Sequence, residues 1–270
     1  MTEDLIRTGG YSVMIFITGD CHGEFQKFST NNFLPQKLMD KEDIVIICGD
    51  FGGVWDLQEE SAEEKYWLDW LDEKPFTTVF ADGNHENFDR LNHDYETVIF
   101  HGGKAHKIRN SVYHLMRGEV FDFEGQRFFV FGGASSHDVD DGILYREDFE
   151  SEEAFRKQIR KMKKQRKLFR VNKLSWWAEE LPCEEEFANA EKNLAKVDYK
   201  VDYVITHCTA QSVVEHMYSF QPESDKLTRY FDDLLQRLQF RKWYFGHYHE
   251  DRTVTEKFIA LYKDFLCVHS

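Results

Sequence analysis

The chain has 270 residues, 41% of them apolar and 16% aromatic, and can therefore bury a large core in one or two domains. Its formal charge of −15 repels nucleic acid and anionic membranes over most of the surface, so an anionic substrate requires a local positive feature such as a bound metal. Because the sequence has no signal peptide, no apolar run of membrane-spanning length and an odd count of five cysteines, we expect a cytoplasmic protein with reduced thiols and no membrane partner.

The first predicted strand, residues 14 to 17, ends in a glycine that is followed by an acid and a histidine. Residues 1 to 13 carry no periodic pattern and are expected to form a loose N-terminal extension. In β conformation Asp20 and His22 point to the same side, where they could bind one metal ion. Alternatively, Gly19 makes a turn, Asp20 caps a helix and His22 is idle, and these residues alone favour this second interpretation.

The same pattern recurs at four later strand ends. Each is a β-branched or aromatic run that closes on a residue able to bind metal. The runs are "DIVIICGD", ending in Gly49 and Asp50; "TTVFADGNHE", with Gly83, Asn84 and His85; "VDYVITH", ending in His207; and "KWYFGHYH", with Gly246, His247 and His249. Glycine before the polar residue suits a backbone that must come close to a shared partner, whereas independent caps do not need it. We therefore predict one shared metal site.

Helical patterns separate these strands, at residues 63 to 73 and 226 to 238. Strands alternating with helices predict a parallel sheet with its site at the carboxyl ends of the strands. The segment "EVFDFEGQRFFVFGGA" alternates around Glu124 and Gly125 like a hairpin, so a second, partly antiparallel sheet is expected. With four prolines and no flexible linker, residues 14 to 270 are predicted to form a single domain.

Two segments in the middle of the chain have no obvious place in the metal site. The loop "GGASSHDVDDG" follows an apolar strand, and its Ser136, His137 and Asp138 could contact substrate, although an ordinary surface loop fits equally well. Residues 156 to 170 are densely basic and have an apolar stripe, which predicts an amphipathic helix packed on the domain, within a helical basic insertion around residues 150 to 195. A lid that guides nucleotide or nucleic-acid phosphates is the alternative.

The motifs together resemble those of the calcineurin-like metallophosphoesterases, which are D-x-H, G-D, G-N-H-[DE], a separate H, and G-H-x-H. All five occur in order between residues 20 and 249. The resemblance implies an α/β fold, a four-layer metallophosphoesterase sandwich in which helices flank two mixed β-sheets. It also implies two metals that share one carboxylate, one held by Asp20, His22, Asp50 and His249 and the other held by Asp50, Asn84, His207 and His247.

The implied activity is hydrolysis of a phosphomonoester or phosphodiester by in-line attack of a metal-bridging hydroxide. Carboxylate and imidazole ligands suit the transition metals Mn, Fe and Zn. We expect two divalent ions, Mn in the first place, with Fe or Zn as alternatives. Asp50 would bridge the metals, and His85, assigned to neither, would protonate or stabilise the leaving oxygen. We expect a small phosphoester substrate. The alternatives are a nuclease, a cyclic-nucleotide phosphodiesterase or a non-catalytic binding module, and the sequence gives no indication of the oligomeric state.

One motif departs from the protein serine/threonine phosphatases, which the chain otherwise resembles at "GDCHGEF" and "GNHE". Those enzymes continue their second motif as G-D-x-V-D-R-G, whereas this chain reads "GDFGGVWD". Gly53 therefore stands where the carboxylate that would orient His85 is expected, and the phosphate-gripping arginine is missing at that point. Protein phosphatase activity is not expected, and Asp56 or a substrate group could be the partner of His85.

Overall fold

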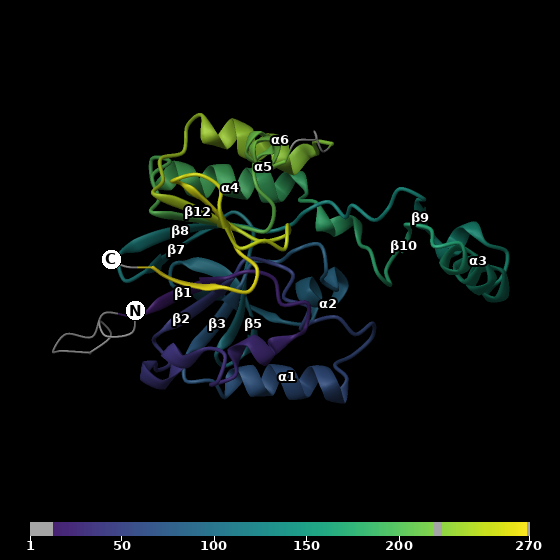
Figure 1. The fold of residues 1–270 in the computed structure, drawn as a ribbon, viewed down its shortest axis with the longest axis horizontal. Coiled ribbons are helices and arrows are strands. Elements are labelled where there is room, and N and C mark those ends of the chain that lie inside the picture. The colour runs from purple at the N-terminus through teal and green to yellow at the C-terminus, as the bar shows by residue number, and fades with distance from the viewer. Residues whose placement is uncertain (1–12, 219–222, 269–270) are drawn as a thin grey trace.

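Two mixed sheets form the centre of the computed structural model, which describes residues 13–218 and 223–268 (Figure 1). The first sheet has the strand order β15-β1-β2-β3-β6-β5-β4 and the second β13-β14-β12-β11-β8-β7. The first contains β1 (Ile15–Thr18), β2 (Ile44–Ile47), β3 (Thr77–Phe80), β4 (Glu96–Phe100), β5 (Gly103–Arg109), β6 (Val112–Leu115) and β15 (Phe265–Val268). The second contains β7 (Glu119–Phe123), β8 (Gln126–Phe131), β11 (Tyr203–Thr206), β12 (Lys242–Phe245), β13 (Arg252–Thr253) and β14 (Phe258–Ala260).

Helices cover the outer face of each sheet. They are α1 (Ala62–Asp72), α2 (Phe88–His93), α4 (Glu184–Lys196), α5 (Gln211–Met217) and α6 (Lys226–Leu235), whereas α3 (Glu152–Lys164) lies away from both sheets (Figure 1). Short 3₁₀ helices are η1 (Phe25–Phe28), η2 (Leu34–Leu38), η3 (Arg146–Asp148) and η4 (Ala178–Glu180). Among the described residues, no helix has both the length and the apolar character needed to span a bilayer. All five cysteines are free.

Alternating side chains along the strands produce the four predicted layers. Ile15 and Ile17 of β1 point into the core between the sheets, whereas Phe16 points outward into the core under α1, with Leu68 of that helix. On the other side, Phe129 of β8 belongs to the core beneath α4, α5 and α6. The predicted fold, two mixed sheets flanked by helices, is confirmed.

The predicted hairpin and helices are present, with small shifts. Glu124 and Gly125 both have positive φ, 54° and 76°, and turn β7 back onto its antiparallel neighbour β8. Helix α1 begins after Ser61, whose hydroxyl accepts a hydrogen bond from the Glu64 amide. Helix α6 ends at Leu235, earlier than the predicted Leu238, although Leu238 is still buried against the same core.

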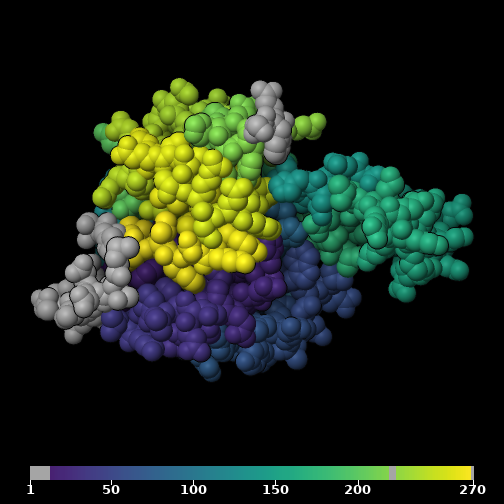
Figure 2. Space-filling model, in the orientation of Figure 1, coloured from purple at the N-terminus to yellow at the C-terminus, as the bar shows by residue number. Residues whose placement is uncertain are grey.

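The basic segment lies on an arm, residues 140 to 175, that extends from the body (Figures 1 and 2). The arm carries α3, η3 and the parallel pair β9 (Ile143–Leu144) and β10 (Arg170–Val171). Helix α3 ends at Lys164 and not at residue 170, because Arg166 takes a left-handed conformation with φ 56°. Helix α4, which falls within the predicted insertion, packs on β7 of the second sheet instead. The predicted N-terminal extension, except for Val13, lies outside the described residues.

Candidate metal centre

The predicted ligands follow five strand ends, three in the first sheet and two in the second. Asp20, Asp50 and Asn84 come after β1, β2 and β3; His207 comes after β11, and His247 and His249 come after β12. Because β1 ends at Thr18, the alternation of a strand does not orient Asp20 and His22 as we predicted. A turn does so, in which His22 has a φ of 50° and its amide donates a hydrogen bond of 2.7 Å to the carbonyl of Asp50.

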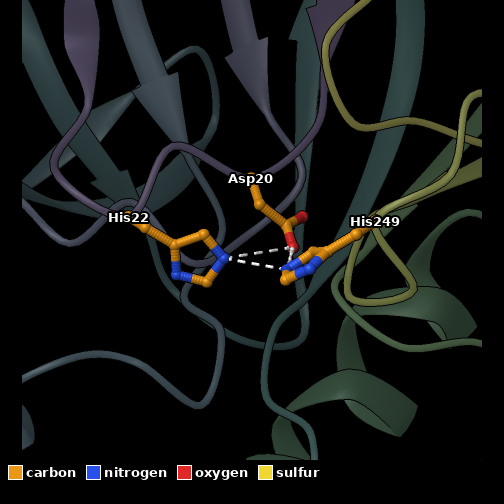
Figure 3. Close-up of side chains that lie close together, drawn as sticks. All are labelled: Asp20, His22 and His249. Atoms are coloured by element: carbon orange, nitrogen blue, oxygen red, sulfur yellow. Dashed lines mark hydrogen bonds and ion pairs between the residues drawn. The ribbon is translucent and has the colours of Figure 1, made fainter.

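Asp20, His22 and His249 form the more exposed of the ligand clusters (Figure 3). The Nε2 atoms of the two histidines are 2.9 Å apart, and Nε2 of His249 lies 3.1 Å from Oδ2 of Asp20. Nε2 of His22 is 3.7 Å from the same oxygen and also 3.7 Å from Oδ2 of Asp50. These nitrogen and oxygen atoms from both sheets therefore face one point.

Asp50, Asn84 and His207 form a second, buried cluster. Nε2 of His207 is 3.2 Å from Oδ2 of Asp50 and 3.2 Å from Oδ1 of Asn84. Nδ1 of His207 is 2.8 Å from the carbonyl of Cys48, which can only accept a hydrogen bond, so Nδ1 carries a proton. In neutral His207, Nε2 is then unprotonated, and three acceptor atoms converge without a donor between them. A cation bound between these three acceptor atoms would accept electron pairs from all of them.

Charge and burial in this cluster also favour a cation. Although burial alone would raise it, the neighbouring His207 holds the pKa of Asp50 well below its usual value. Burial alone would lower the pKa of His207, but the carboxylates of Asp50 and Asp20 raise it to about 9. Without a metal, a proton on His207 therefore partly compensates the two buried carboxylates.

His247 contributes backbone and ring to the same region. Its amide donates to Oδ1 of Asp20 at 3.0 Å, and its ring lies 4.9 Å from that of His207. Burial, followed by the charge of His207, lowers the pKa of His247 well below its usual value, which leaves a neutral imidazole suited to metal binding. Among the described residues, however, its ring nitrogens belong to none of the clusters of three close ligand atoms.

These distances fit divalent transition metals. An ion about 2.0–2.1 Å from each of two ligand atoms holds them about 3 Å apart when the two bonds are near a right angle. The contacts of 2.9, 3.1 and 3.2 Å described above match that separation. Left-handed backbone at His22, Asp50, His247 and His249 is a further sign of a functional site, because strained conformations persist where the surroundings enforce them.

Glycines allow the ligand side chains to approach the neighbouring loops. A Cβ atom on Gly83 would lie 2.0 Å from Oδ1 of Asp50, and one on Gly246 would lie 2.1 Å from Oδ1 of Asp20. Neither position can therefore carry any other residue without displacing a carboxylate. This contact explains why glycine precedes the polar residue at these strand ends.

His85 lies beside the clusters without a carboxylate to orient it. A ring nitrogen of His85, a ring nitrogen of His22 and a carboxylate oxygen of Asp50 lie within 4.8 Å of one another, and the amide of His85 donates to Oδ1 of Asp50 at 2.8 Å. Its ring has no hydrogen-bonded acid among the residues that the structure describes. Asp56, the possible substitute, is instead engaged by Ser61 and Glu64. The indole ring of Trp55 lies beside His85, with 6.2 Å between the centroids of the two rings.

The loop with Ser136, His137 and Asp138 adjoins the site, but two of its three side chains have partners within the protein. The Ser136 hydroxyl accepts from Nδ2 of Asn84 at 3.2 Å and donates to Glu180 at 2.6 Å, so it fixes which way the amide oxygen of Asn84 points. Asp138 forms an ion pair with Arg170 at 2.7 Å. Only His137 is exposed, with its ring 4.4 Å from that of His247.

Three supporting residues of the site were missed by sequence reasoning. Glu86, within the G-N-H-[DE] motif, accepts hydrogen bonds from the amides of Phe51 and Gly52 and so holds the loop after Asp50 in place. Glu180 holds Ser136, but nothing in the sequence around it predicts this contact. The third is Lys27, whose ammonium group is surrounded by backbone carbonyls.

Lys27 joins the first ligand loop to the C-terminal part of the chain. Its Nζ donates to the carbonyls of Gly19, Asp20 and Tyr262 at 2.9, 3.1 and 2.8 Å. The ring of Tyr262 in turn stacks on that of His249, 4.7 Å between centroids. One ammonium group therefore positions the backbone of one predicted ligand and the aromatic neighbour of another.

We expect Lys27→Met to weaken binding of the metal held by Asp20 and His249 by roughly 10–100-fold, as loss of an outer-shell contact typically does. The measurement is metal content and manganese affinity by elemental analysis and calorimetry. Lys41→Met is the matched control, because Lys41 also binds a backbone carbonyl, that of Asp72 at 2.6 Å, far from the site. Equal affinities in the two variants would contradict the positioning role.

Comparison with known proteins agrees with this geometry. The family model described as calcineurin-like phosphoesterase matches residues 13–251. Among curated proteins, lariat debranching enzyme A of Xenopus laevis is 30% identical over 148 residues, a stretch that covers 49% of this chain and 26% of that protein. The chain thus spans about a quarter of the length of this relative. The resemblance seen in the motifs is confirmed, and the chain belongs to the calcineurin-like phosphoesterases, a family of hydrolases that cleave phosphoester bonds.

Proposed function

We propose that the protein hydrolyses a small phosphoester with the help of two divalent transition metals, with manganese as the expected ion and iron or zinc as alternatives. The observation that carries the proposal is the convergence of acceptor atoms from both sheets around Asp50. Its Oδ2 faces His207 at 3.2 Å and His22 at 3.7 Å, so one carboxylate borders both clusters.

The ligand sets follow from the clusters together with the family resemblance. One ion would be held by Asp20, His22, Asp50 and His249, and the other by Asp50, Asn84, His207 and His247. When bound, the two ions make water nucleophilic at neutral pH and neutralise charge on the phosphoryl oxygens. This local positive charge is what draws a phosphate into a protein with a net charge of −15.

Side chains of the protein orient a metal ligand, supply a proton and contact the substrate. Ser136 and Glu180 keep the amide oxygen of Asn84 facing the site. His85 lies next to the clusters, where its ring can give a proton to the leaving oxygen or stabilise it. His137, exposed beside His247, is the member of its loop placed to contact the phosphoryl group.

A nucleic-acid phosphodiester is the second candidate substrate. It is favoured by the name of the relative, a lariat debranching enzyme, and by the basic arm. Part of the arm's charge is already compensated, however, because Arg156 pairs with Glu152 and Lys167 pairs with Asp141. The apolar residues of α3 also pack within the arm, with Phe155 5.3 Å from Phe149. We therefore favour the small substrate over a nuclease, a cyclic-nucleotide phosphodiesterase or a non-catalytic binding module.

Removing the shared carboxylate should empty both sites. We expect Asp50→Asn to lose both metals and activity on 4-nitrophenyl phosphate, whereas His249→Ala loses mainly one metal. Elemental analysis of the purified proteins measures this, with Asp56→Asn as a control that keeps both ions, because Asp56 is engaged by Ser61 outside the clusters. Full occupancy in Asp50→Asn would rule out a shared carboxylate.

His85→Ala should retain metal and lose turnover by roughly 10²–10⁴-fold, the usual contribution of a general acid. The low end is expected because no carboxylate orients the ring. The loss should shrink for aryl phosphates whose leaving groups need little protonation. If kcat falls equally for good and poor leaving groups, His85 has a positional role only.

Variants of the basic arm distinguish the two candidate substrates, a small phosphoester and a nucleic acid. We expect Lys161, Lys163 and Lys164→Gln together to change hydrolysis of small substrates by no more than a few-fold. The control is a triple variant on the body, Lys37, Lys192 and Lys200→Gln, which changes the net charge equally. A large loss on single-stranded DNA or RNA, confined to the arm variant and with a salt slope of about −0.7 per neutralised phosphate, would favour the nuclease.

A further inference from the structure

A cavity of 340 Å³ opens on the His85 side of the metal centre. His22 and Trp55 both line it, and the ring of His85 lies 5.2 Å from that of His22 and 6.2 Å from that of Trp55. Its size falls within the range of small-molecule sites, about 300–1,000 Å³. His85 does not itself line the cavity, but two of its ring neighbours do, so the cavity adjoins the position of a group that leaves the phosphorus beside His85.

The glycine that departs from the phosphatase motif lies in the wall of this cavity. Gly52 and Gly53 form part of its wall, and no side chain projects from either. A Cβ atom on Gly53 would lie 2.4 Å from Cε1 of Phe51, so the local packing also excludes the missing aspartate. The position that would support His85 in a protein phosphatase therefore carries no side chain here, because the ring of Phe51 fills the space beside it.

The cavity walls are aromatic and held in place. Trp67 packs edge-on against Trp70, with ring centroids 5.4 Å apart, and lies 6.1 Å from Phe25. Trp55 packs edge-on against the buried Trp177 at 5.7 Å. Two indole rings fixed in this way offer faces that attract cations and apolar groups.

The acidic and basic side chains that line the cavity, apart from His22, are all carboxylates. Glu24, Asp56 and Glu63 line it, and the first and last are exposed. Glu64 also lines it, but Arg90 pairs with it at 2.8 Å. No lysine or arginine is among the lining residues; Lys27 and Lys263 line a neighbouring cavity of 800 Å³. An anionic leaving group would therefore be repelled.

From these observations we propose that the cavity receives the leaving alcohol of a phosphomonoester and selects alcohols that carry an ammonium group. The inference rests on the proposed function. In the reaction, the bond from phosphorus to the alcohol oxygen breaks as a bond to a water oxygen forms, and the alcohol takes up a proton. The indole faces and carboxylates stabilise a cation on that alcohol, whereas the residues that would hold the metals lie at the phosphoryl end.

The test compares three esters that differ in the charge of the alcohol. They are phosphocholine, 3,3-dimethylbutyl phosphate, in which carbon replaces the nitrogen, and the phosphate ester of 3-hydroxypropanoate. At low ionic strength the manganese-loaded protein should hydrolyse them in that order, with kcat/KM about tenfold higher for the first than for the second. Salt should reduce the difference, because exposed charges are screened.

Variants of the cavity rim then assign the effect to its charges. Glu24→Gln and Glu63→Gln together should reduce the preference for phosphocholine several-fold. The matched control is Glu59→Gln with Glu73→Gln, two exposed glutamates outside the cavity, which should leave the preference unchanged. Hydrolysis of 4-nitrophenyl phosphate together with equal rates for the three esters would overturn this inference alone. Failure to hydrolyse any of the four, with both metals bound, would overturn the proposed function as well.

Discussion

The hydrogen bond from His207 Nδ1 to the carbonyl of Cys48 joins the two sheets at their carboxyl ends. It directs Nε2 of the same ring toward Asp50 and Asn84, which belong to the other sheet. A second hydrogen bond, from the His247 amide to Asp20, also joins the two sheets. The position of every predicted ligand depends on this junction, because neither sheet by itself supplies enough donors for a dinuclear centre.

The same junction has an electrostatic cost. Asp20 and Asp50 are 3% and 1% exposed, and carboxylates so deeply buried are unfavourable unless paired. His207 and the amide of His247 reach these carboxylates from the opposite sheet, so the attraction between the halves also holds the two sheets together. The two buried carboxylates are tolerated in this acidic protein because a cation bound between the sheets can offset their negative charge.

Much of the site could be predicted because its signals are local in sequence. A glycine next to a ligand at a strand end reports a close approach, and Gly83 and Gly246 do contact carboxylates. The roles of Ser136 and Lys27 could not be predicted in this way. Ser136 depends on Glu180, 44 residues away, and Lys27 on Tyr262, 235 residues away. Likewise, the layers of the sandwich followed from strand alternation, whereas the end of α3 within the arm coincides with the left-handed conformation of Arg166, which no periodic pattern indicates.

The separation of the ligands along the chain also bears on how the protein is made. His22 and His249, whose ring nitrogens are 2.9 Å apart, are 227 residues apart in sequence. Closing so long a loop is entropically costly, and the neighbouring strands must be in place first. On the ribosome, a nascent chain therefore presents only four of the seven proposed ligands, Asp20, His22, Asp50 and Asn84, until β11 and β12 have emerged. The complete set of ligands is thus available only late in biosynthesis, and translation products that end before His207 lack a complete centre.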